Sequence, residues 1–210
     1  MGSPIDARSR LLSMLRTKSV FYGDFVLASG AKSTYYIDCR LTTLDSEGAW
    51  LVGQVMRELI KAEADSRGVR VQGVGGLTMG ADPMALAIGM QSFSAKDEPV
   101  WRPFVVRKAP KSHGQTKVIE GNYKAGDNVV VIDDVITRGD STIAAINAVE
   151  KEGGKVLFVA ALVDRQQGGR QNIEKLGYAV VSAFVRDDLV GPQGEAAQVS
   201  SRTADNLTRH

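Results

Sequence analysis

Hydrophobic positions recur along the N-terminal part of the chain at two different spacings. Leu11, Leu12 and Leu15 stand at helical spacing among positive charges, which predicts an amphipathic helix over residues 5–20. β-Forming residues then flank a Ser-Gly pair in FVLASGAKSTYYID, which predicts two strands joined by a turn. An apolar stripe at helical spacing begins after Asp45 and predicts a second helix through about residue 62.

From residue 69 onward the pattern repeats a short apolar run, a turn and a helical segment. The apolar runs are VRVQGVGG, RPFVVRK, NVVVID, KVLFVAALVDR and YAVVSAFV. Runs without polar alternation are typical of strands buried on both faces, and helical segments between them imply parallel crossovers. The pattern therefore predicts an α/β fold with a doubly wound, mainly parallel sheet flanked by helices.

The chain shows no repeat, linker or low-complexity tract that would divide it. Its 210 residues, 43% hydrophobic and 24% charged, fit one domain with a full core. We expect a single domain over residues 1–210, with a helix and a small hood of strands in about 1–45. The last segment, about 190–210, is polar and is expected to be a frayed tail.

Composition excludes several classes of protein. A net charge of +2 leaves no overall basic field, so a nucleic-acid partner is not expected. No run of about 18 apolar residues or leader segment predicts a membrane partner, and we expect a cytoplasmic protein. The single cysteine, Cys39, excludes an internal disulfide, and with two histidines it argues against zinc. Oxygen-bound Mg²⁺ remains compatible with this composition.

The stretch VVVIDDVITRGDST, residues 129–142, places two neighbouring acids, Asp133 and Asp134, at the end of a buried apolar run. Adjacent carboxylates repel each other and are costly to desolvate, so a ligand explains them better than folding alone. The hydroxyl and glycine residues that follow open a helix whose N–H groups suit a phosphate, whereas carboxylates suit vicinal hydroxyls or hydrated Mg²⁺. The stretch predicts a site for a sugar phosphate with a free diol, and a plain helix-capping segment is the alternative.

Residues 107–117, RKAPKSHGQTK, form a second polar stretch with four cations and one histidine, His113. Proline, glycine and charge predict an exposed loop after a strand end. Ligands of open α/β sheets collect beyond the carboxyl ends of the strands, so this loop would share an edge with the acids. There its cations would cover a polyanion, and Lys111 or His113 would stabilise or protonate a leaving group. The alternative is a solvated run of charges.

Two common nucleotide motifs are absent. GVGGLTMG has Thr78 where the G-x-G-x-x-G pattern needs its third glycine, and G-x-x-x-x-G-K-[ST] does not occur. These absences argue against a dehydrogenase and against a P-loop kinase. The glycine-rich turn could still offer backbone N–H groups to a pyrophosphate, or could simply be a tight turn.

Four segments together resemble a known family. VVVIDDVITRGDST resembles the phosphoribosyl pyrophosphate (PRPP) motif of type I phosphoribosyltransferases, and RKAPKSHG resembles the R-K-x-x-K-x-H-G catalytic loop of the orotate phosphoribosyltransferases. FVLASGAKSTYYID and VDRQQGG are similar to the N-terminal segment and the strand-end arginine region of the same enzymes. The matches span residues 25–169 in the expected order.

The resemblance implies an enzyme of de novo pyrimidine (UMP) biosynthesis. It implies transfer of the 5-phosphoribosyl group from PRPP to orotate, which gives orotidine 5′-monophosphate and pyrophosphate. Mg²⁺ would be bound mainly through PRPP and water, with no direct protein ligand set. The family likeness also implies a homodimer in which the catalytic loop is shared across subunits.

The resemblance further implies roles for individual residues on the PRPP side. Asp133 and Asp134 would face the ribose diol. The 5-phosphate would be held by Thr137, Arg138, Gly139, Asp140 and Ser141. The pyrophosphate side would be formed by Arg107, Lys108, Lys111 and His113, of which Lys111 and His113 would be catalytic.

On the base side, Arg165 would meet the orotate carboxylate, and Tyr36 and Ile37 would border the ring. The chain departs from the family pattern at two places. It carries Ala28 where many members have lysine, and Met79-Gly80 where many have Tyr-Lys in the turn after a sheet strand. Contacts from that turn to pyrophosphate would then come from the backbone.

Two other interpretations are open on the sequence. A phosphoribosyltransferase for another base, such as a purine, would share the acid pair but need no arginine for a carboxylate. A regulatory protein that binds PRPP without turnover could lose Lys111 and His113, and both are present. No helix-turn-helix pattern accompanies the core, which argues further against a regulator.

Overall fold

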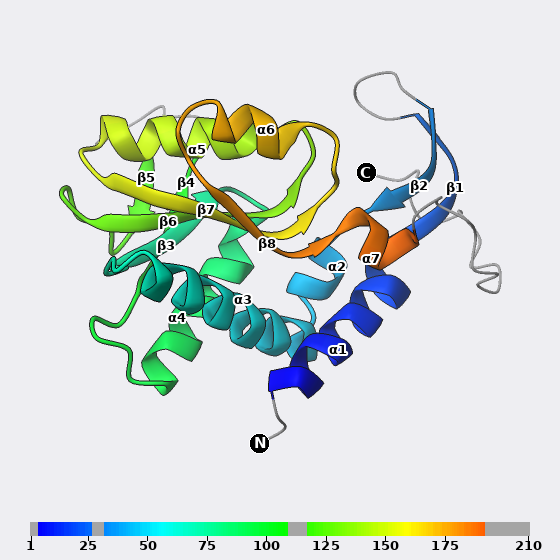
Figure 1. Ribbon diagram of the computed structural model, residues 1–210, viewed down its shortest axis with the longest axis horizontal. Coiled ribbons are helices and arrows are strands. Elements are labelled where there is room, and N and C mark those ends of the chain that lie inside the picture. The colour runs from blue at the N-terminus through cyan, green and yellow to red at the C-terminus, as the bar shows by residue number, and fades with distance from the viewer. Residues whose placement is uncertain (1–3, 27–31, 109–116, 192–210) are drawn as a thin grey trace.

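The computed structural model describes residues 4–26, 32–108 and 117–191, without the side chains of Pro4 and Ile5. A six-stranded sheet lies between two layers of helices, and a separate two-stranded hairpin stands beside it (Figure 1). The sheet strands are β3 (Gly73–Leu77), β4 (Arg102–Val106), β5 (Ile119–Gly121), β6 (Asn128–Ile136), β7 (Lys155–Asp164) and β8 (Val180–Val185).

The strand order is β5-β4-β3-β6-β7-β8. Every neighbouring pair is parallel except β4 and β5, which are antiparallel. The predicted doubly wound, mainly parallel fold is confirmed. The sequence did not predict β5, because three residues are too few for a periodic signal. The order reverses between β3 and β6, and the crevice at such a switch point is where ligands bind in these sheets.

Alternate residues of β6 divide the core into two layers. Val129 and Val131 pack into a cluster with residues of the helices on one face, whereas Val130 and Ile132 pack into the cluster on the other. The first face carries α5 (Asp140–Lys151) and α6 (Gly169–Glu174), and the second carries α1 (Pro4–Met14), α3 (Ser46–Ser66) and α4 (Ala81–Ser94) (Figure 1). Full burial on both faces explains why the β6 run lacks polar alternation.

The N-terminal segment matches the predicted order of helix, strand, turn and strand. Helix α1 continues as a π-helical turn over Leu15–Ser19, so the predicted helix over residues 5–20 is confirmed to within one residue. The antiparallel hairpin of β1 (Val20–Val26) and β2 (Lys32–Ile37) follows. The short helices α2 (Arg40–Thr43) and α7 (Arg186–Val190) were not predicted.

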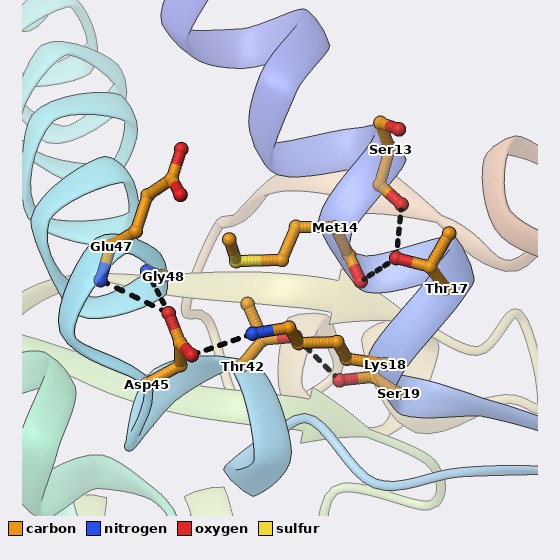
Figure 2. Close-up of polar contacts among 9 residues, drawn as sticks. All are labelled: Ser13, Met14, Thr17, Lys18, Ser19, Thr42, Asp45, Glu47 and Gly48. Atoms are coloured by element: carbon orange, nitrogen blue, oxygen red, sulfur yellow. Dashed lines mark hydrogen bonds and ion pairs between the residues drawn. The ribbon is translucent and has the colours of Figure 1, made fainter.

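Side-chain contacts attach this N-terminal segment to the start of α3 (Figure 2). Asp45 caps the helix by accepting hydrogen bonds from the N–H groups of Glu47 at 3.0 Å and Gly48 at 2.9 Å. Its other oxygen accepts from Lys18 Nζ at 2.6 Å. The predicted helix start at Asp45 is confirmed, and the helix runs to Ser66, past the predicted end. These contacts hold the hairpin in place beside the sheet.

The remaining predicted helices lie where the pattern placed them, between consecutive sheet strands. No helix within the described ranges is long and apolar enough to cross a membrane. The predicted polar tail begins at α7, and residues 192–210 lie outside the described residues.

Candidate active site

The two neighbouring acids lie inside β6 rather than after it. Pairing with β7 continues past them, from Asp133 opposite Ala161 to Ile136 opposite Asp164. The sequence-based expectation that the strand ends at the acids is therefore corrected. Because successive side chains of a strand point to opposite faces, the two carboxyl groups serve two different layers of the molecule.

Asp133 points to the α5 face and is 7% exposed. Its Oδ2 accepts hydrogen bonds from Ser141 Oγ at 2.8 Å and Thr142 Oγ1 at 2.6 Å. Burial raises the pKa of Asp133, and the bonds from Thr142 and Ser141 oppose that rise. Asp133 therefore ties the first turn of α5 to the strand through two hydroxyls, and not through the backbone N–H groups that the helix-capping alternative requires. The sequence suggested that the Ser141 and Thr142 hydroxyls would help to hold a phosphate, and in the structure both donate to Asp133.

Asp134 points to the α4 face, beside the turn that joins β3 to α4. Burial and the charge of Asp133 raise the pKa of Asp134 to about 7. A Cβ atom at Gly80 would collide with the Asp134 carboxylate, so glycine allows this turn to approach the acid. The turn that holds Met79-Gly80 therefore lies directly beside the Asp134 carboxylate. The turn supplies backbone, not a long side chain, beside Asp134.

The loop from Thr137 to Ser141 is held against the turn before α6. Gly139 has φ +87° and caps α5, and a glycine offers no side-chain oxygen to the helix N–H groups. The Gly169 N–H donates to the Thr137 carbonyl at 3.0 Å. Arg138 and Asp140 are exposed and form an ion pair at 3.2 Å. The start of α5 is consequently a firm backbone corner with positive dipole character, which favours a bound phosphate.

Arg165 follows the last residue of β7 and is buried, with 5% exposure. Its N–H donates to the Ile136 carbonyl at 2.9 Å, which places it beside the end of the acid-bearing strand. Its guanidinium stacks on the Tyr35 ring, with Cζ 5.4 Å from the ring centroid. Nε and Nη2 are buried and have no hydrogen-bond partner within the described part of the chain. A buried cation with open donors is costly unless an anion completes it.

The hairpin brings Tyr35 to Arg165, a contact that the sequence did not suggest, and the roles of Tyr36 and Ile37 beside the base stay predictions. Tyr36 is half-buried and packs against Phe25, with ring centroids 5.8 Å apart. The Ile37 side chain belongs to the core. Tyr35, which was not predicted, is the residue that contacts Arg165. The alternation of side chains along β2 could have indicated that Tyr35 faces the sheet, because Tyr35 and Ile37 share one face of the strand and Tyr36 lies on the other.

The cationic stretch after β4 is described only at its two ends. Arg107 follows β4, its N–H donates to the Val118 carbonyl at 2.9 Å, and its side chain pairs with Glu120 at 3.3 Å. Lys108 is exposed. Lys111 and His113 lie outside the described residues, as does Ala28. Their predicted roles stay predictions.

One sheet edge thus combines an acid pair, a helix start suited to phosphate and a buried guanidinium with free donors. Residues 41–198 match the family described as "Phosphoribosyl transferase domain", and the chain belongs to that family. The PRPP motif at residues 129–142 lies within this match, so the resemblance to this family is confirmed.

Individual relatives place the chain more narrowly, in the orotate branch of the family. Orotate phosphoribosyltransferase of Aquifex aeolicus (strain VF5) is 41% identical over 186 residues, covering 87% of this chain and 97% of the relative. The enzyme of the same name from Tropheryma whipplei (strain Twist) is 41% identical over 183 residues, covering 87% and 82%.

Solved structures agree with this placement. The orotate phosphoribosyltransferase of Mycobacterium tuberculosis H37Rv in complex with Fe(III) dicitrate superposes with a TM-score of 0.73 at 39% identity, covering 87% of this chain and 98% of that one. The same enzyme in complex with PRPP gives a TM-score of 0.70 at 36% identity, with the same coverage. Adenine phosphoribosyltransferase of Saccharomyces cerevisiae, at 19% identity and a TM-score of 0.54, shares the fold alone.

Proposed function

We propose that this protein transfers the 5-phosphoribosyl group of PRPP to N1 of orotate, which releases pyrophosphate and forms orotidine 5′-monophosphate for UMP synthesis. The observation that carries the choice of base is the buried Arg165 guanidinium, two of whose nitrogens have no hydrogen-bond partner among the described residues. Orotate brings a carboxylate that pairs with such a fork through charge-assisted hydrogen bonds. Purine bases and uracil have no carboxylate and would leave the cation unpaired.

One assay tests this choice against the alternatives. The protein is mixed with PRPP, Mg²⁺ and each of orotate, uracil, adenine and hypoxanthine, and pyrophosphate release is followed. Release with orotate alone is expected. Release with adenine or hypoxanthine would instead identify a purine enzyme, and PRPP binding without release with any base would identify a PRPP sensor.

In the proposed mechanism the residues of β6 and α5 hold PRPP by its ribose hydroxyls and its 5-phosphate. Asp134 and Asp133 accept hydrogen bonds from the ribose hydroxyls, and the N–H groups from Thr137 to Ser141 bind the 5-phosphate. Arg165 orients the base so that N1 faces the anomeric carbon. The bond from that carbon to the pyrophosphate oxygen breaks as the bond to N1 forms, and the proton on N1 leaves to the departing pyrophosphate or to water. The positive ribosyl centre needs positioning and charge stabilisation, not a protein nucleophile.

The leaving pyrophosphate carries the largest charge change in this reaction. We propose that Arg107, Lys108, Lys111 and His113 neutralise it, with Lys111 and His113 acting on the oxygen that leaves. Arg107 supports this proposal by its place directly after β4, the strand next to β3. Cations that meet the developing charge lower the barrier more than they strengthen ground-state binding.

Magnesium is the cofactor of this proposal. Among residues 4–26, 32–108 and 117–191, no group of three or more His, Cys, Asp and Glu side chains could hold a metal ion by itself. Asp133 and Asp134 offer oxygen donors, and those of Asp133 are partly used by α5. They fit an ion that takes most of its ligands from PRPP and water. Bound there, Mg²⁺ would neutralise charge on the diphosphate.

The cytoplasmic location stays a prediction.

An Asp134→Asn variant should use PRPP poorly. The amide keeps the shape of the side chain but loses the charge that strengthens hydrogen bonds from the diol, so KM for PRPP should rise about 10–100-fold. Steady-state kinetics at pH 8 measure this change. Asp65→Asn, on the exposed side of α3, is the matched control and should behave as wild type. An unchanged KM for PRPP in Asp134→Asn would contradict the role of this acid.

The same variant should be more stable than wild type at high pH. The native pKa of Asp134 is about 7, above its ordinary value of 3.8. The contribution of the protonated Asp134 carboxyl to the free energy of unfolding is therefore fully present below pH 4 and is lost as the pH rises through 7. At pH 8 the buried charge opposes folding, so Asn should raise the free energy of unfolding by about 4 kcal/mol, or roughly 8–16 °C in Tm. A Tm gain that is equal at pH 5 and pH 8 would be the contrary result in thermal denaturation.

We also propose that the protein is a homodimer that docks through an apolar face on α4 and α3. Leu86, Met90 and Phe93 lie on one side of α4 and are 58%, 58% and 73% exposed. Trp50 of α3 is 51% exposed and extends this face. It lies one turn before Gly53, where α3 packs closely against the α4 backbone. These four side chains leave roughly 500 Å² of apolar surface, a large share of the ~800 Å² that each partner of a standard interface buries.

A Phe93→Glu substitution tests this interface. A buried charge at the centre of an apolar contact should convert the dimer to a monomer, which halves the mass measured by light scattering. Leu176→Glu places the same charge on another exposed leucine, 52% exposed, just after α6 and should leave the dimer intact. If Phe93→Glu stays a dimer, or if wild type is a monomer, the face is not the dimer interface.

A further inference from the structure

We propose that Tyr35 is a positioning residue, whose ring face holds the Arg165 guanidinium in the orientation that receives the carboxylate of the base. The inference rests on the proposed function and adds a residue that determines how firmly the base is held. Tyr35 and Arg165 are both buried, at 8% and 5% exposure, and the Cζ of Arg165 lies 5.4 Å from the ring centroid. Each comes from a different part of the fold, β2 of the hairpin and the end of β7.

A ring holds a cation in a way that an acid cannot. A carboxylate partner would occupy the N–H donors of the guanidinium and cancel its charge, whereas an aromatic face attracts the cation and leaves the donors in its plane free. The Arg165 Nε and Nη2 are indeed unpartnered within the described ranges. Arg165 is therefore stabilised in a buried position and still able to bind an anion.

A nearby arginine, Arg170 in α6, shows the opposite arrangement. Arg170 donates from Nε to Asp164 at 2.9 Å and from Nη2 to Ser182 Oγ at 3.1 Å, and Nη1 bonds the Val180 carbonyl. All three of its nitrogens are used to tie α6 to β7 and β8. Arg170 is therefore a structural arginine with no donor nitrogen left for a ligand. Arg165 differs because two of its nitrogens have no partner among the described residues.

Tyr35 is itself fixed by elements on both sides. In the hairpin it pairs with Tyr22 of β1. Its hydroxyl contacts the Arg186 side chain at the start of α7, and Arg186 also pairs with Asp187. The hairpin and α7 lie next to each other beyond the carboxyl ends of the strands (Figure 1). Tyr35 is thus held by β1 and by α7, which are far apart in sequence. A ring fixed in this way can define the position of the Arg165 guanidinium.

Replacement of the ring tests the inference through a split in kinetic parameters. Tyr35→Leu should raise KM for orotate about 10–30-fold, with kcat changed less than threefold and KM for PRPP less than twofold. Tyr35→Phe keeps the ring and should stay within about threefold of wild type for orotate. A purely structural role would instead change KM for both substrates together and lower Tm. Equal orotate KM in Tyr35→Leu and wild type would overturn the proposal.

Two further measurements keep the test decisive if Tyr35→Leu does not fold. Phenylalanine with one, two or three ring fluorines at position 35 keeps the shape but weakens the negative ring face, so KM for orotate should rise stepwise, by about fivefold overall. A flat series would overturn the inference. In an Arg165→Met background the fluorines should have no effect, because the cation is gone. Failure of wild type to use orotate would reject the proposed function, whereas a flat series with an active wild type rejects the role of Tyr35 alone.

Discussion

An Arg165→Met variant should lose about 10²–10⁴-fold in kcat/KM for orotate and keep its fold. Two charge-assisted hydrogen bonds to a carboxylate contribute about 1.5–3 kcal/mol each, and each 1.4 kcal/mol is tenfold in rate. KM for PRPP should change little, because the ribose and the phosphate contact β6 and α5. Methionine also removes a buried cation whose Nε and Nη2 have no partner in the part of the chain that the structure describes, so Tm should equal or exceed that of wild type.

Arg67→Met is the matched control for this variant. The Arg67 guanidinium also lies over an aromatic ring, with Cζ 5.6 Å from the Phe158 centroid, but it is exposed and follows the end of α3. Its loss should leave orotate kinetics unchanged. Initial rates of pyrophosphate release over a range of orotate concentrations give both results. A fall of less than tenfold in Arg165→Met would mean that this guanidinium does not bind the base.

A Lys111→Ala variant should lose about 10²–10³-fold in kcat with little change in KM for orotate. The leaving pyrophosphate gains charge as its bond to the ribosyl carbon breaks, and a cation placed for that charge acts mainly in the transition state. Lys155→Ala removes the same charge at the first residue of β7, at the amino ends of the parallel strands and away from the site, and should be fully active. Wild-type turnover in Lys111→Ala would rule out the cationic-loop mechanism.

Mixing two inactive variants tests whether Lys111 acts in the partner's site. Lys111→Ala and Arg165→Met protomers combined in equal amounts form mixed dimers, which have one intact site only if the loop crosses the interface. Recovery of about a quarter of wild-type activity is then expected from random pairing of equal protomers. If each loop serves its own subunit, the mixture stays inactive.

The pattern of apolar runs was sufficient to predict the sheet and its helices, because burial on both faces removes polar alternation from β6 and β7. Short elements were missed. β5, α2 and α7 are three to five residues long, and their positions depend on contacts with distant segments rather than on local periodicity. The strand end was misplaced for the same reason, since β6 continues through its two acids by pairing with β7.

Within the site, sequence motifs identified Asp133, Asp134 and Arg165 but not their separate tasks. Asp133 accepts hydrogen bonds from the Ser141 and Thr142 hydroxyls of α5, whereas Asp134 lies against Gly80 with a pKa of about 7. That division follows from which face of the strand each side chain enters, a consequence of strand register that residue types do not encode.

The sequence by itself determined the fold class, the family and the residue types that meet a sugar phosphate, because strand burial and motif spacing are local properties of the chain. Only the tertiary structure decided that Tyr35 contacts Arg165, and that Gly80 approaches Asp134. Those contacts join segments more than fifty residues apart. They exist because packing of the hairpin and the β3–α4 turn against the sheet edge selects, from several candidate side chains, the ones that face the site.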